Sequence, residues 1–68
     1  MFHYAFLSAP KEPHITASTV DAAIKPICSK AQASTVATHT HPWIIIVHCN
    51  EELTEQERTL IGQAIEGI

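Results

Sequence analysis

The stretch Trp43-Ile44-Ile45-Ile46-Val47-His48-Cys49 is the strongest strand signal in this chain of 68 residues. Four of its seven residues are β-branched, and such residues are enriched in strands. His41-Pro42 precedes the stretch and Asn50-Glu51-Glu52 follows it, so residues that interrupt a strand bound it on both sides. The pattern predicts a strand over residues 43–49 that lies in the centre of a sheet.

Two further strands are predicted on the N-terminal side of this stretch. Residues 2–8 form a short apolar run rich in aromatic side chains, and residues 34–40 are rich in β-branched ones. Residues 9–14, with two prolines in four residues, predict a connection. The turn before Trp43 has two interpretations: a tight turn with a cis His41–Pro42 bond, or a longer loop, which we favour.

An apolar stripe at helical spacing, running from Val20 to Ala31, predicts a first helix over residues 18–32. Pro26 lies inside this segment, and a proline there removes the N–H that would bond the Ala22 carbonyl. Because the stripe continues in phase beyond Pro26, we expect one helix that is kinked there. Two short helical pieces are the alternative.

A capping box predicts the start of a second helix. Thr54 is the cap, and Glu57 three residues later is the partner that bonds the backbone of the cap. The apolar residues that follow have the spacing of one helix face: Leu60, Ile61, Ala64, Ile65 and Ile68. The order β-α-β-β-α predicts a single small α+β domain, residues 1–68, in which a three-stranded sheet packs with two amphipathic helices.

The amino-acid composition of the chain limits the classes of function that it can have. Hydrophobic residues make up 46% and charged residues 16% of the chain, which predicts a folded domain rather than a disordered one. The formal net charge of −3 argues against a nucleic-acid surface. No apolar run approaches the roughly 20 residues of a membrane span, and the start lacks the basic residues of a secretory leader. We therefore expect a cytoplasmic protein that binds neither nucleic acid nor membrane.

Large apolar side chains occupy both faces of the strand at residues 43–49. Because successive side chains point to opposite faces, Ile44, Ile46 and His48 share one of them. Burying two isoleucines contributes about 3–6 kcal/mol, which is comparable to the stability of a small domain. Three arrangements would cover both faces: the helices lie on opposite faces, a second copy of the chain covers one, or a different protein does.

These patterns favour a small cytoplasmic protein-binding module, a regulator or inhibitor that acts by contact as a homodimer or on a partner protein. The candidate residues are the exposed strand face and the acidic edge that follows it: Ile44, Ile46, His48, Glu51, Glu52 and Glu55. Residues 35–68 carry one cation against five acidic side chains, and an acidic edge steers association with a basic surface.

A metal-binding module is a second hypothesis. The chain has five histidines, and His39 and His41 are two residues apart, which places them on one face of a strand. Zinc accepts such a pair and needs further ligands, for which His48 is the candidate. Zinc modules typically have two close ligand pairs, whereas this chain has one. We therefore expect neither a metal nor another cofactor.

Catalysis by this chain alone is not expected. Cys28 and Cys49 are interpreted as buried thiols rather than a disulfide, because two cysteines form no framework and nothing marks export. The two glycines both fall in the second predicted helix, so there is no phosphate-binding loop or nucleophile elbow. The remaining alternative is a subunit of an enzyme whose site forms at an oligomer interface.

Overall fold

The computed structural model describes residues 1–11 and 14–68 and has the predicted element order. Its elements are β1 (Phe2–Ser8), α1 (Ala17–Ile24), β2 (Gln32–Ala37), β3 (Trp43–Cys49) and α2 (Glu55–Glu66). The strands form one antiparallel sheet in the order β1-β3-β2, so β3 is central as predicted, and the α+β class is confirmed. Residues 12–13 of the connection predicted at 9–14 lie outside the described residues.

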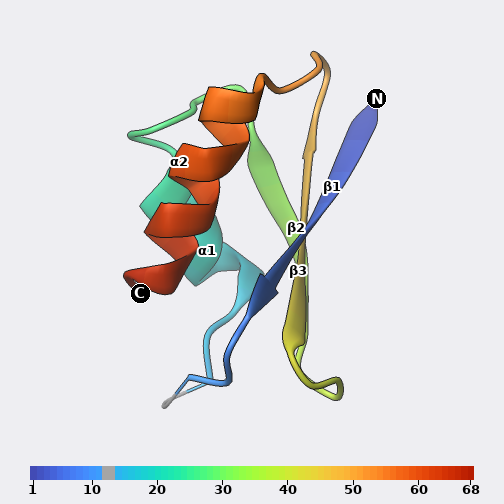
Figure 1. Ribbon diagram of the computed structural model, residues 1–68, viewed down its shortest axis with the longest axis vertical. Helices are drawn as coiled ribbons and strands as arrows, with labels where there is room; N and C mark the ends of the chain where they lie inside the picture. Colours follow the sequence, from blue (N-terminus) through green and yellow to red (C-terminus); the bar gives the residue numbers. More distant parts are fainter. Residues whose placement is uncertain (12–13) are drawn as a thin grey trace.

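Both helices lie on the same side of the sheet, with α2 over β1 and α1 over β2 (Figure 1). Burial therefore alternates along β3: Ile45 and Val47 are fully buried, whereas Ile44 and Ile46 are only partly buried. The core lies between the sheet and the helices, where the inner face of β3 meets Val20, Ile24, Ile61 and Ile65. This excludes the arrangement in which the helices cover opposite faces.

The two outer strands pair with β3 differently. β1 pairs without interruption over all seven residues, from Phe2–Cys49 to Ser8–Trp43. β2 pairs in a register that shifts between Ala33 and Thr35, which is a β-bulge. The strand expected at 34–40 was therefore misplaced. It begins at Gln32, because Ala33 packs beneath α1, and it ends at Ala37.

The β2–β3 connection is a loop at residues 38–42, so the longer-loop interpretation is confirmed. The His41–Pro42 peptide bond within it is cis. The Thr40 hydroxyl donates to the Pro42 carbonyl at 2.9 Å. A tight turn with Thr40 opposite Trp43 would place Val36 opposite Val47. With the longer loop Val36 lies opposite Ile45, two positions along β3, so it stays on the same face of the sheet.

The first helix ends at Ile24, so the expectation of one helix over 18–32 was wrong. Pro26 has no N–H to continue the ladder, and the chain leaves the helix through a turn at residues 25–27. The Cys28 N–H still bonds the Ile24 carbonyl at 2.8 Å, which closes that turn. Cys28 and Ala31 reach the core from this non-helical segment. The stripe predicted their burial correctly and their conformation incorrectly.

The second helix begins as predicted. The Thr54 hydroxyl accepts from the Glu57 N–H at 3.1 Å, and the Glu57 carboxylate accepts from the Thr54 N–H at 2.9 Å. Ile68, the last residue of the predicted apolar helix face, is partly buried and packs against the core. Neither helix in the described part of the chain has the length and apolar character needed to cross a membrane.

Candidate functional site

The sheet face that the helices leave uncovered, here named the open face, consists of three cross-strand rows. The row nearest the 38–42 loop is Leu7, Ile44 and Ala37. The middle row is Ala5, Ile46 and Thr35. The row at the far end is His3, His48 and Gln32. The face is therefore apolar near the loop and becomes polar toward the end of β3.

The apolar part of the open face is accessible. Leu7 is 66% exposed, the highest value for a large hydrophobic side chain apart from Met1. Ile44 and Ile46 are partly buried, and because the helices lie on the other face, their cover comes from the flanking strands. A monomer that keeps these side chains at the water boundary forgoes up to about 1.5–3 kcal/mol of burial for Leu7, and less for the two isoleucines because they are already partly buried.

The open face carries no Asp, Glu, Lys or Arg in any of its three rows. Its polar end is formed by His3 and His48, whose ring centroids lie 6.0 Å apart with the planes tilted by 57°. A surface of this kind excludes charged partners from its centre but accepts an apolar one without desolvating an ion.

The three candidate glutamates lie beyond the end of β3 that carries His48. Glu51 and Glu52 are exposed in the loop that leads to α2, and Glu55 is exposed at the start of that helix. Glu51 pairs with Lys30 at 3.5 Å. Within the described ranges Glu52 and Glu55 have no ion pair. The structure therefore brings Ile44, Ile46 and His48 together and places the acidic residues at the rim of the sheet.

Lys30 forms ion pairs with Glu51 of this rim and with Glu57 in the first turn of α2. Its ammonium lies 3.2 Å from Glu57 and 3.5 Å from Glu51, and the bond to Glu57 raises the pKa of Lys30. The Thr54 backbone N–H and Lys30 together lower the pKa of Glu57. Lys30 is therefore already engaged with acidic side chains, as Lys25 is with Asp21 at 3.7 Å, which leaves the free acidity of the rim on Glu52 and Glu55.

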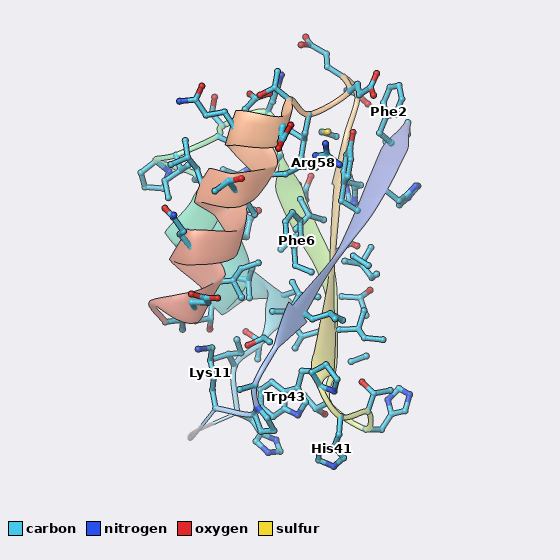
Figure 2. The ribbon with its side chains drawn as sticks, viewed as in Figure 1. Phe2, Phe6, Lys11, His41, Trp43 and Arg58 are labelled. Carbon is cyan, nitrogen blue, oxygen red and sulfur yellow. The ribbon has the colours of Figure 1, made fainter. Side chains whose placement is uncertain are left out.

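The histidines proposed as metal ligands do not converge. His39 and His41 belong to the 38–42 loop, where Figure 2 shows His41 at the bottom of the molecule near Trp43. His48 lies near the opposite end of β3, paired with His3. Over residues 1–11 and 14–68, no three His, Cys, Asp or Glu side chains are placed to hold a metal ion.

Both cysteines are buried free thiols, as expected. Cys28 lies 3.7 Å from a Glu57 oxygen, and burial, with the Glu57 charge, raises the pKa of its thiol. A raised pKa keeps the sulfur protonated and weakly nucleophilic. Cys49 donates to the Glu51 carbonyl. No pocket is present in the described part of the chain, so these thiols face no cleft.

The sequence predicts the β3 contribution to the open face and, through the alternation of β2, the contributions of Thr35 and Ala37, but it leaves open which face of β1 joins them. Leu7, Ala5 and His3 flank β3 on one side, and Ala37 and Thr35 flank it on the other. The alternation of apolar residues in β1 separates its two faces, but which face meets the helices depends on the pairing with β3. That pairing is a tertiary property.

Comparison of the chain with protein-family models, with curated proteins and with solved structures finds no match.

Proposed function

We propose that this chain is a small protein-binding module, a regulator or inhibitor that acts by contact, and that its open face receives an apolar patch of a larger protein. The observation that carries the proposal is the uncharged sheet face that both helices leave uncovered. Uncovered apolar faces bordered by polar residues are typical of protein-interaction sites.

The anchors of this interaction are Leu7, Ile44 and Ile46. They lie in adjacent rows of the sheet and come from two strands that are fixed by continuous pairing. Binding energy in protein interfaces is concentrated in a few central apolar side chains surrounded by less important contacts. A rigid strand presents such side chains at little entropic cost.

The chemistry of the rim favours a partner with Lys or Arg beside its apolar patch. Glu52 and Glu55 are exposed at the end of the sheet that carries His48. Opposite charges at an interface rim mainly accelerate association and select among partners. The partner therefore approaches with its basic side toward the loop that follows β3.

We propose the cytoplasm as the compartment of this module. Two free, buried thiols are compatible with a reducing environment. The acidic net charge of −3 keeps the module away from nucleic acid and anionic membrane surfaces.

The test is affinity capture from the native cell with matched variants. Ile46→Lys places a charge in the middle of the open face, and Ala22→Lys places the same charge on an exposed position of α1. Far-UV circular dichroism confirms that both variants fold. The proposal expects one protein that the wild type and Ala22→Lys retain and Ile46→Lys loses, with the same ranking when the two purified proteins are titrated.

A captured set that is the same for all three baits would contradict the proposal, as would the absence of a captured protein for the wild type. Glu52→Lys refines the result. It is expected to slow association and to leave the dissociation rate nearly unchanged, because a rim charge acts on the encounter.

A further inference from the structure

We propose that β1 pairs with β1 of a second copy of this chain, so that two molecules form one six-stranded antiparallel sheet. The proposal concerns the edge of the sheet rather than the open face. It goes beyond the proposed function, because each can hold without the other.

The edge formed by β1 lacks the charges, prolines and bulges that usually prevent edge strands from pairing. Phe2–Ser8 contains no charged residue and no proline, and it pairs with β3 without a bulge. Edge strands in monomeric proteins are usually interrupted by one of these features. Leu7 is 66% exposed and Phe2 43% exposed, so the edge is apolar as well as regular.

The opposite edge, formed by β2, is protected. A bulge interrupts it between Ala33 and Thr35. The Ala33 N–H, which would otherwise be free for pairing, donates to the Asp21 carboxylate at 3.1 Å. Lys25 donates to the Ala31 carbonyl at 3.0 Å, just before the strand begins. Since only one edge of the sheet is open, pairing stops at two copies and forms no extended fibre.

The sequence of β1 fits a second copy of itself about a twofold axis. Ala5 is the midpoint of Phe2–Ser8, so an axis through Ala5 pairs all seven residues. In this register Tyr4 lies opposite Phe6 of the second copy, which is a favourable aromatic cross-strand pair. His3 lies opposite Leu7, and the two Ala5 side chains meet at the axis without crowding. No charged side chains of β1 face each other.

The size of the side that carries β1 sets an upper limit on the area of the dimer interface. Figure 1 looks onto the side of the molecule where β1 and α2 lie in front, and this side is 30 Å long and 20 Å wide. Two such sides in contact bury up to about 1,200 Å², which is the lower limit for specific interfaces. Arg58 lies toward the Phe2 end of this side (Figure 2), so the twofold axis places the two arginines at opposite ends.

Dimer formation would join the two open faces into one surface. The helices of both copies stay on one side of the six-stranded sheet, and the rows of Ile44 and Ile46 lie on the other. Because a single copy offers a face only three strands wide, pairing doubles the area available to a partner.

The experiment measures mass in solution by sedimentation equilibrium for the wild type, Ala5→Lys and Thr35→Lys. Ala5 and Thr35 both lie beside Ile46 on the open face and both are exposed, but Ala5 belongs to the β1 edge and Thr35 to the β2 edge. We expect twice the 7.5 kDa of the single chain for the wild type and for Thr35→Lys. Ala5→Lys places two lysines at the twofold axis, which weakens the dimer by at least about tenfold.

A charge exchange tests the register itself. Ala5→Glu alone is expected to be monomeric for the same reason as Ala5→Lys, and an equimolar mixture of the two variants is expected to restore the dimer. Three results would overturn the proposal: a monomeric wild type, a dimer that survives Ala5→Lys, or a dimer that Ala5→Lys and Thr35→Lys disrupt equally. The last would indicate packing through the open faces. A monomeric wild type, or a dimer that survives Ala5→Lys, leaves the capture of a partner by the open face unaffected, whereas packing through the open faces would mean that a second copy occupies that surface.

Discussion

The Glu57 carboxylate connects three parts of the chain. One of its oxygens accepts from the Thr54 N–H at 2.9 Å, and the other lies 3.2 Å from the Lys30 ammonium and 3.7 Å from the Cys28 sulfur. The residue that completes the cap of α2 therefore also ties this helix to the segment that follows α1. The negative charge lies in the first turn of α2, where the helix dipole favours it.

The contribution of Glu57 to stability should depend on pH. The pKa of Glu57 in the folded protein lies below the ordinary value of a glutamate, first because of the Thr54 N–H and then because of Lys30. A lowered folded-state pKa means that the stabilisation is present above the unfolded-state pKa and is lost as the pH falls through the folded-state pKa. We expect the wild type to have a higher urea midpoint than Glu57→Gln at pH 7, and the difference to vanish in strong acid.

Glu52→Gln is the matched control for this prediction, because Glu52 is exposed and has no ion pair in the described part of the chain. Its midpoint should follow that of the wild type across the whole pH range. A difference between the wild type and Glu57→Gln that stays constant from pH 7 into strong acid would show that packing, rather than the charge, causes it.

At the scale of elements, α2 contains a glycine that its position does not require. Gly62 lies in the interior of the helix, and a Cβ there would have its nearest contact at 3.9 Å from Phe6 Cδ1, an ordinary van der Waals distance. Glycine in a helix interior costs about 0.8–1.0 kcal/mol relative to alanine. Gly62→Ala is therefore expected to stabilise the protein by about that amount, measured by urea unfolding.

Gly67→Ala provides the comparison for this substitution. Gly67 is the residue after the helix, where a Cβ has only ordinary contacts with the Gln63 and Ala64 carbonyls. Gly67 caps the helix rather than lying in its interior, so the gain should be smaller. A destabilised Gly62→Ala would show that Phe6 cannot accept the added methyl group, and that the approach of α2 to β1 depends on the glycine.

The elements with local signals were predictable to the residue. The β-branched run of β3 and the Thr54–Glu57 box each act within a few residues, so the sequence alone determines them. The first helix was predicted too long because periodicity reports which side chains are buried. It does not report which backbone groups bond, and Cys28 is buried without being helical. The pairing of β1 with β3 completes the open face, and no local pattern encodes that register.

At the scale of the whole molecule, side chains on the two faces of the sheet contribute unequally to the free energy of unfolding. Ile45 is fully buried between the sheet and the helices, whereas its neighbour Ile46 is partly buried on the open face. Domains have a stability of roughly 0.05–0.15 kcal/mol per residue, so a chain of this size has about 3–10 kcal/mol in total. A single core side chain is a large part of that amount.

Alanine substitutions at Ile45 and Ile46 measure this difference in the free energy of unfolding directly. Ile45→Ala removes buried methyl groups from a closed core and should cost about 2–5 kcal/mol, which is a large part of the total stability. Ile46→Ala removes the same atoms from a face that borders water, and about 1 kcal/mol is expected. Urea unfolding monitored by Trp43 fluorescence gives both values. Equal costs would mean that a cover lies over the open face even in the isolated protein, and the surface assigned to a partner would then already be occupied.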